Sequence, residues 1–520
     1  MANFVRIGAK HPSLYIAWVL IWRKMLAKWV LNNDRKAHRI LEILPGFVSW
    51  NLILFPIWAS FFVPHYVAYF VILFDVFWFY KSGNTAVTSL IAHFKIRAAS
   101  KVDWLTMAKK HSDFNKVQHI ALIPTYKEPI TTLKNTLDKL AAQDLPSKKF
   151  MTIVMAFEER ELEAKEKSKI LTREYKNKFA NFLSTYHPDI AGEVKGKSSN
   201  QAYAGKWIKN KLINELGYNM DFVTITSVDA DSQFHPKYYS YLTFEFLNHK
   251  DRYRRFWHAA IWYYANIWKV PSPIRVVNTF GSVWRTGILV RRDLLVPTSV
   301  YSVSLKMIDE VGYWDVDVIP EDYRIFFKCF FAFGGKVHVE PMFIPIYVDA
   351  AQSSTYWKTL VNQYEQMKRW AWGVSDDPNF IKWWITKKEI PFWDKTVHLI
   401  NIVLDHFLWP VNWFIITLGT NLPVILNPVF ARTVLGQNLP KISFIILNAC
   451  LVFLLIILWV DWRQRPKREK DVPLIAKLIQ PLEFILMPVV GFFFSALPGI
   501  DAHSRLMFGK YLEYKVTEKV

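Results

Sequence analysis

Residues 222–231 read Phe-Val-Thr-Ile-Thr-Ser-Val-Asp-Ala-Asp, an apolar run that stops at two acidic residues, Asp229 and Asp231. Short apolar runs rich in β-branched residues are typical of buried strands. Similar runs occupy residues 119–124 and 150–157. Strands that alternate with helices predict a mostly parallel sheet, whose ligands bind beyond the carboxyl ends of its strands. Asp229 and Asp231 are expected at such an end.

The segments that follow the first two strands are predicted helices. Residues 130–142 form the first, after a turn at residues 125–129. Residues 159–186 form the second, and we interpret their dense Glu/Lys pattern as a solvated helical face.

Composition indicates a membrane protein with a separate water-exposed part. The chain has 520 residues, of which 52% are hydrophobic and 21% charged. The net charge is +21, and much of the excess lies beside apolar runs, as in residues 463–468. That placement favours the positive-inside rule and contact with anionic lipid, and it disfavours a nucleic-acid partner. Cys329 and Cys450 lie in unrelated contexts and provide neither a disulfide framework nor a metal quartet.

Five apolar runs have the length of a membrane span. They are residues 43–63, 64–80, 396–418, 441–460 and 476–498, the first two divided at Pro64-His65 as in a tight hairpin. Glu483 and several prolines leave a re-entrant form open for the last run. Residues 82–395 contain no spanning run and therefore lie on one side of the membrane. The basic segments 35–39 and 463–470 predict that this side is cytoplasmic.

The amino-terminal region predicts a helix in the headgroup layer. In residues 13–30, tryptophans alternate with lysine and arginine, as in helices that lie in the plane of the membrane. No cleavage site of small residues follows the apolar run, so we expect no cleavable signal peptide.

Two acidic clusters carry the candidate chemistry. Asp229 and Asp231 can hold a divalent cation that bridges phosphates, and Mg²⁺ or Mn²⁺ suits such oxygen ligands. An exposed turn explains many lone Asp-x-Asp triplets equally well. Glu321 and Asp322 follow Pro320 and open a predicted helix. They serve either as acidic residues that favour a helix start, worth under about 1 kcal/mol, or as a general base for an acceptor hydroxyl.

A third cluster lies on the predicted helix 359–372. Spacings of three and four place Gln366, Arg369 and Trp370 on one face of that helix. Arginine can form a fork to a departing diphosphate, and tryptophan offers a flat surface to a sugar. The alternative is a membrane-surface anchor, because arginine and tryptophan also occupy that position.

The order of these motifs resembles membrane-embedded family 2 glycosyltransferases, the group of cellulose, chitin and hyaluronan synthases. The resemblance covers roughly residues 118–375. The motifs that carry it are residues 123–129, 229–231, 311–315, 321–322 and 366–370. It implies a GT-A-type nucleotide-binding fold, a UDP- or GDP-sugar donor and inversion at the anomeric carbon.

The resemblance also implies roles for single residues. Asp229 and Asp231 would contact Mg²⁺ or Mn²⁺ and the nucleotide, and Asp322, beside Glu321, would be the catalytic base. The diphosphate and acceptor contacts would fall to the third cluster, Gln366, Arg369 and Trp370.

The chain departs from the family pattern where the nucleotide base should bind. Glu158 and Glu159 stand where the family usually has an aspartate pair, and the extra methylene of glutamate leaves the identity of the base open. Pro320 replaces a common threonine. Lys197, near a helix start, suits a phosphate or sugar hydroxyl, with a solvated basic turn as the alternative.

We therefore expect an α/β fold in which a cytosolic GT-A-type domain with a mostly parallel sheet is inserted between transmembrane helices. Seven segments are expected: an interfacial helix (1–42), a transmembrane hairpin (43–81), a linker (82–117), the glycosyltransferase domain (118–375), a second interfacial helix (376–395), transmembrane helices (396–500) and a carboxyl tail (501–520).

The expected function is inverting, metal-dependent transfer of a hexose from a nucleotide-sugar to a growing glycan, at the cytoplasmic face of the plasma membrane. Polar residues in the predicted spans, such as Asn401 and Asn412, are either a path for the polymer or glue between helices. One alternative is transfer of a single sugar to a lipid or lipid-linked acceptor. Another is a catalytically silent membrane scaffold. Oligomeric state stays open.

Overall fold

An eight-stranded sheet forms the centre of the α/β part in the computed structural model, which describes residues 12–468, 473, 475, 480–513 and 517. The strands are β1 (Gln118–Thr125), β2 (Met151–Glu158), β3 (Asn181–His187), β4 (Val223–Ser227), β5 (Gln233–Phe234), β6 (Arg255–Trp262), β7 (Tyr301–Ser304) and β8 (His338–Tyr347). Their order in the sheet is β3-β2-β1-β4-β7-β6-β8-β5.

The sheet is mostly parallel in its first half. β1 pairs in parallel with β2 and β4, β2 pairs in parallel with β3, and β6 pairs in parallel with β8. β7 runs antiparallel to β4 and β6, and β5 runs antiparallel to β8. This order, with one reversed strand beside β4, is the GT-A-type α/β arrangement expected from the sequence.

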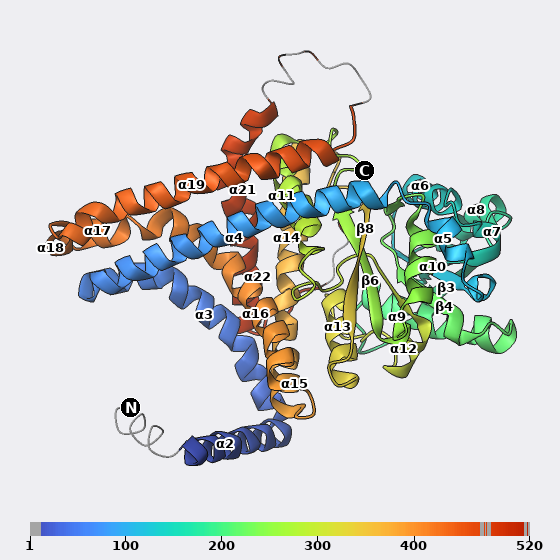
Figure 1. Cartoon of the computed structure of the whole chain (residues 1–520), viewed down its shortest axis with the longest axis horizontal. Helices are drawn as coiled ribbons and strands as arrows, with labels where there is room; N and C mark the ends of the chain where they lie inside the picture. Colours follow the sequence, from blue (N-terminus) through green and yellow to red (C-terminus); the bar gives the residue numbers. More distant parts are fainter. Residues whose placement is uncertain (1–11, 469–472, 474, 476–479, 514–516, 518–520) are drawn as a thin grey trace.

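Helices cover both faces of the sheet and bury its apolar side chains (Figure 1). They are α5 (Trp104–Lys109), α6 (Ile130–Ala141), α7 (Ser147–Phe150), α8 (Ala164–Tyr175), α9 (Lys197–Lys209), α10 (Tyr238–Asn248), α11 (Ser272–Ile288), α12 (Leu305–Glu310), α13 (Glu321–Ala332), α14 (Tyr356–Ala371) and α15 (Asp377–Thr386). The parallel strands place the β4 end, α9, α13 and α14 around one edge of the sheet.

The predicted helix at residues 159–186 is wrong in its second half. The helix α8 ends at Tyr175, and residues 181–187 form the edge strand β3. This strand hydrogen-bonds only to β2, so it alternates buried and half-buried side chains and lacks the apolar run of a central strand. Pairing with β2 overrides the local preference of the segment.

Long helices and short helical turns between them form the other part of the molecule. They are α2 (Pro12–Asn32), α3 (Asp34–Phe62), α4 (Pro64–Ala99), α16 (Phe392–Phe414), α17 (Leu422–Leu426), α18 (Pro428–Ala431), α19 (Val434–Gln464), α21 (Met487–Gly491) and α22 (Leu497–Met507). Among the described residues, four segments are long and apolar enough to cross a membrane: 34–62, 392–419, 434–464 and 480–507.

The helix α4 corrects two expectations. It does not end at residue 80 but continues to Ala99, so most of the expected linker 82–117 is helical. Its second half packs beside α11 and β8, and Ala86, Ala92 and Ile96 are buried there. It is also not among the four segments selected by apolar composition, because polar residues such as Asp75 interrupt it. It nevertheless lies side by side with α19 (Figure 1).

The basic end of α19 lies on the side of the α/β part. Arg465 donates to the Thr279 hydroxyl at 2.6 Å, and the Trp268 indole donates to the Pro466 carbonyl at 2.9 Å. Residues 463–468 and the sheet therefore share one side, as the charge pattern predicts. Residues 1–11, 469–470, 476–479 and 518–520, which belong to other predicted segments, lie outside the described residues.

The last candidate segment, 480–507, differs in direction from α4 and α19. In Figure 1, α21 and α22 run steeply across those two helices. The helix α22 packs against the first half of α3: Arg39 donates to the Leu506 carbonyl at 2.9 Å, and Ser49 and His503 share a hydrogen bond of 2.9 Å. The segment is nevertheless long and apolar enough to span a membrane, so both forms considered for it from the sequence stay open.

Candidate active site

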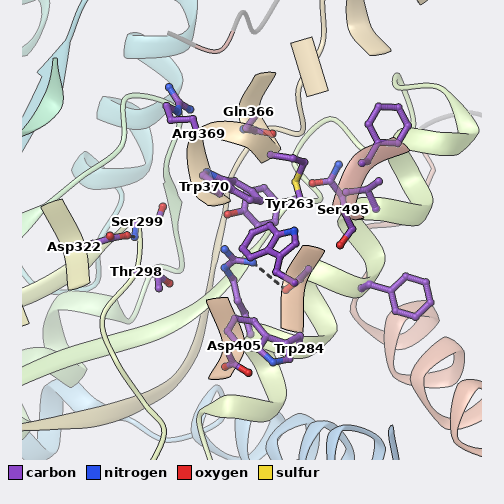
Figure 2. Close-up of a pocket in the computed structure, with 18 of the residues that line it drawn as sticks. Tyr263, Trp284, Thr298, Ser299, Asp322, Gln366, Arg369, Trp370, Asp405 and Ser495 are labelled. Atoms are coloured by element: carbon purple, nitrogen blue, oxygen red, sulfur yellow. Dashed lines mark hydrogen bonds between the residues drawn. The ribbon is translucent and has the colours of Figure 1, made fainter. Parts of the chain in front are cut away.

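A cavity of about 1260 Å³ opens at the carboxyl end of β4 and extends among the long helices. Nine of the ten predicted site residues line it: Glu158, Lys197, Asp229, Asp231, Glu321, Asp322, Gln366, Arg369 and Trp370. Figure 2 shows Asp322 on one wall and Gln366, Arg369 and Trp370 along another. Residues that are far apart in the sequence thus meet in one place.

Lys197 joins two of the acidic clusters. Its ammonium lies 2.7 Å from Asp229 Oδ1 and 2.8 Å from Glu321 Oε1, and it donates to the Ser299 carbonyl at 2.9 Å. Burial lowers the pKa of Lys197, but the carboxylates of Asp229 and Glu321 outweigh it and raise that pKa well above its ordinary value. The side chain is therefore a fixed positive charge. Gly196 before it has φ +146°, a conformation available almost only to glycine.

Asp322 is held in the cavity wall by two backbone N–H groups. It lies at the first turn of α13, where its carboxylate accepts the Ser299 N–H at 2.9 Å and the Tyr323 N–H at 3.0 Å. Burial raises the pKa of Asp322, and the backbone N–H of Ser299 and Lys197 oppose that rise. Burial also raises the pKa of Glu321, to about 7, against the effect of Lys197. A carboxylate whose pKa is raised in this way accepts a proton more readily than one in water.

Ser299 connects the acidic groups, and sequence reasoning missed it. Its hydroxyl donates to Asp229 Oδ2 through a short hydrogen bond, while its own N–H contacts Asp322. Its φ is +60°, which is uncommon for a residue other than glycine. Such backbone conformations concentrate at functional sites. The sequence contains no signal for it, because the residue lies in an irregular loop before β7.

The two aspartates after β4 fit a divalent cation that arrives with a diphosphate. Both line the cavity, and Asp231 Oδ2 accepts the Asp349 N–H at 2.7 Å, which fixes its orientation. Within the described residues, no three His, Cys, Asp or Glu side chains gather to hold a metal alone. Mg²⁺ is commonly held by one or two carboxylates together with substrate phosphates, so two carboxylates suffice.

The third cluster lies on α14, as the spacing predicts. Gln366 is buried and accepts a hydrogen bond from Gln363 at 3.1 Å. Arg369 donates to the Thr517 hydroxyl at 2.8 Å, so a residue of the carboxyl tail also lines the cavity. The Trp370 ring lies 5.5 Å from the Tyr263 ring. Neither Thr517 nor Tyr263 was predicted from the sequence.

The end of β2 separates the two glutamates. Glu158 is buried, lines the cavity and accepts a hydrogen bond from the Arg160 Nε. Glu159 lies in the turn that follows β2, where it is exposed and does not line the cavity. The Arg160 guanidinium lies 3.9 Å above the Tyr126 ring. The predicted substrate contact of Glu159 is therefore not brought into the site.

The far end of the cavity lies among the long helices. Asn401, Asp405, His406 and Asn412 of α16 line it, together with Trp409. Asp405 pairs with Lys81 of α4 at 2.5 Å. The polar residues of α16 that are costly in lipid thus face the cavity.

The opposite wall is apolar. Leu447, Leu451 and Leu454 of α19 line it, with Val490 and Phe494 from the last segment. Polar groups of α16 and apolar groups of α19 thus line the same cavity.

Comparison with known proteins gives the class of the domain. Residues 224–460 match the family described as "Glycosyl transferase family group 2". No curated protein matches the chain. A mannosyltransferase from Pyrobaculum calidifontis, PcManGT, solved with GDP-Man and Mn²⁺, is 10% identical, with 82% of this chain and 100% of that chain covered and a TM-score of 0.41. S. aureus TarS 1–349 is 12% identical, with 69% and 95% covered and a TM-score of 0.35.

The matched segment begins inside β4, one residue after its start, and includes the acidic clusters, the α14 cluster, α16 and most of α19. The sheet order and the matched family agree on a sugar-transferring domain of GT-A type. The matched part of the chain, residues 224–460, is therefore a glycosyltransferase domain, and candidate membrane helices flank the α/β part.

Proposed function

We propose that the enzyme adds sugars, with inversion at the anomeric carbon, to a growing glycan that leaves through the cavity between its own helices. The observation that supports this most directly is the continuity of the cavity. The same hollow that holds Asp229 and Asp322 reaches Asn401 and Asn412 on a candidate membrane helix. A glycan that grew at Asp322 would have room to pass toward the membrane.

The acceptor hydroxyl would lie between Asp322 and the sugar donor. Asp322 would take the proton of that hydroxyl as its oxygen attacks the anomeric carbon. The bond between that carbon and the diphosphate would break, and the diphosphate would leave with the bonding electrons. Attack on the side opposite the leaving group inverts the configuration at that carbon. Trp370 would offer a flat surface to the acceptor ring.

The leaving diphosphate meets positive charge from two elements. Lys197 of α9 and Arg369 of α14 line the same cavity as Asp229. Asp229 and Asp231 would hold Mg²⁺ or Mn²⁺ together with the diphosphate, and the cation would neutralise charge on the leaving group. Glu158, held by Arg160, would face the nucleotide base of a UDP- or GDP-sugar.

The side of the membrane follows from charge. The basic end of α19 contacts the α/β part through Thr279 and Trp268. Under the positive-inside rule, the catalytic domain would face the cytoplasm, where nucleotide-sugars are made available.

Donor turnover with product sizing tests the proposal. Purified protein in detergent would be incubated with UDP-glucose, UDP-N-acetylglucosamine or GDP-mannose and with Mg²⁺ or Mn²⁺. The wild type is expected to release nucleoside diphosphate and to form long chains at low conversion. Asp322→Asn should reduce turnover by roughly a hundredfold or more, because it removes the base. Asp113→Asn, outside the cavity, is the control and should behave as the wild type.

A second candidate rests on the apolar wall of the cavity. Leu447, Leu451 and Leu454 of α19 suit the tail of a lipid acceptor, which would receive a single sugar. One-sugar products that partition with lipid would favour this function over chain growth. Absence of turnover with every donor would favour a silent scaffold instead.

A further inference from the structure

Arg285 lies in the cavity at the place where the catalytic cluster meets the long helices. It is near the end of α11, a helix that packs on α4 and α19. Its guanidinium carbon lies 5.2 Å from the Trp370 ring centroid, 5.1 Å from that of Tyr263 and 5.7 Å from that of Trp284. In Figure 2, Trp370 and Tyr263 lie near the centre of the view and Trp284 lies below them, near Asp405.

The charge of Arg285 has no acidic partner in the described part of the chain. Its one hydrogen bond there is long, 3.4 Å to the Gly281 carbonyl of its own helix, and its Nε is buried without a partner. The neighbouring cations differ: Arg275 pairs with Glu483, and Lys81 pairs with Asp405.

A partly buried cation without a counter-ion is unfavourable, so a ligand that brings a negative charge would be stabilised there. Aromatic faces hold a guanidinium by cation–π attraction and leave its planar fork available to a carboxylate or a phosphate. Arg285 therefore has the chemistry of an anion-binding group.

Arg285 lies away from the place where the donor's diphosphate is proposed to bind. Lys197 is already bound to Asp229 and Glu321 at the β4 edge, whereas Arg285 contacts Trp370, the proposed acceptor ring. Tyr263 and Trp284 extend this aromatic surface. Flat aromatic surfaces next to a guanidinium match a sugar ring that carries an acidic substituent.

We propose that the acceptor is an acidic glycan, and that Arg285 binds an anionic group on one of its sugars, while Trp370, Tyr263 and Trp284 contact the sugar rings. This inference rests on the proposed function and specifies its acceptor. The polar residues Asn401 and Asn412 further along the cavity favour a glycan over a lipid tail in this position.

The test compares two matched acceptors. One is an oligosaccharide that contains uronic acid, and the other is its carboxyl-reduced, neutral counterpart. Transfer of labelled sugar to each is measured with the donor that the wild type uses, and donor hydrolysis without acceptor is measured in parallel. The wild type is expected to use the acidic acceptor with a lower KM.

Three variants make the test specific. Arg285→Gln should raise the KM for the acidic acceptor about tenfold or more, because a charged hydrogen bond is lost. Its KM for the neutral acceptor should rise much less, because that acceptor has no anionic group for Arg285 to bind. Arg285→Lys should lie between the two, since it keeps the charge without the fork. Arg173→Gln removes an exposed arginine outside the cavity and should have no effect.

Several outcomes would overturn the inference. They are equal use of both acceptors by the wild type, an equal loss on both in Arg285→Gln, and transfer only to polyprenyl phosphate in vesicles. If Arg285→Gln does not fold, the test relies on the acceptor preference of the wild type and on the KM values of Arg285→Lys for the two acceptors. A wild type that neither hydrolyses nor transfers from any donor contradicts the proposed function itself, and this result is distinct from the others.

Discussion

At the scale of single residues, Ser299 links the groups of the candidate active site. Its hydroxyl donates to Asp229, its N–H to Asp322, and its carbonyl accepts from Lys197. Most of this arrangement depends on a backbone with φ +60°. Ser299 thus fixes the orientation of both carboxylates from one position in the cavity wall.

Two substitutions separate the hydroxyl of Ser299 from its backbone. Ser299→Ala and Ser299→Gly both lose the bond to Asp229, so both should lower turnover roughly tenfold or more. They should differ in stability, because glycine adopts a positive φ without strain and alanine does not. We expect the unfolding free energy of the glycine variant to be about 1 kcal/mol higher than that of the alanine variant. Denaturation in detergent and initial rates measure the two effects. Unchanged turnover in both variants would remove Ser299 from the site.

The acid side of the pH–rate profile should report Asp322. Its pKa is raised by burial, so the fraction of active carboxylate should fall at a higher pH than for an exposed aspartate. The positive charge of Lys197 opposes this rise. Lys197→Met should therefore move the acid limb of kcat/KM to higher pH, in whatever activity remains. If the acid limb of the Lys197→Met profile stays in place or moves to lower pH, the assignment of Asp322 as the base is contradicted.

At the scale of elements, local pattern predicted the central strands but not the edge. The segments of β1, β2 and β4 are rich in apolar and β-branched residues and are buried along nearly their whole length, because both faces of the sheet are covered there. The strand β3 has only one neighbour and a mixed pattern, and it was predicted as a helix. Likewise, Asp229 and Asp322 follow from spacing and order, whereas Ser299 and Tyr263 join the site only through the folded chain. Ser299 and Tyr263 are placed in the site by contacts between segments far apart in the sequence, and local composition does not indicate them.

His119 provides a stability test of the sheet. It is buried in β1 and hydrogen-bonds to Thr224 of β4 at 2.7 Å and to Thr243 of α10 at 2.8 Å. Burial lowers the pKa of His119 to about 3, below the ordinary value of about 6.5. Because the folded pKa is the lower one, the stabilisation is present above pH 6.5 and is lost as the pH falls toward 3. At pH 5 the loss should be about 2 kcal/mol.

The comparison of variants isolates this contribution. His119→Gln should show a smaller drop in unfolding free energy between pH 7 and pH 5 than the wild type, although it is less stable at pH 7. His111→Gln, in an outer loop, is the control and should keep the full drop. Equal drops in all three proteins would mean that His119 does not set the acid sensitivity.

At the scale of the whole molecule, charged pairs connect the α/β part to the last apolar segment. Arg275 of α11 donates from Nε to Glu483 at 2.8 Å, and a second bond between the same groups is shorter. Both side chains are mostly buried. Glu483 is a charged residue within an apolar run of the sequence, and the structure gives it an arginine partner. The segment after it supplies Val490 and Phe494 to the cavity wall.

Replacing one partner of this pair should therefore lower the unfolding free energy more than expected from the loss on replacing both. Glu483→Gln leaves Arg275 without its counter-ion, and Arg275→Met leaves Glu483 alone, so each should lower the unfolding free energy by about 3 kcal/mol. The double variant Arg275→Met/Glu483→Met should lose less than the sum, since neither charge is left unpaired. Thermal or chemical unfolding in one detergent measures all four proteins. Additive losses would show that the two charges act independently, and the last segment would then be held against α11 by apolar packing alone.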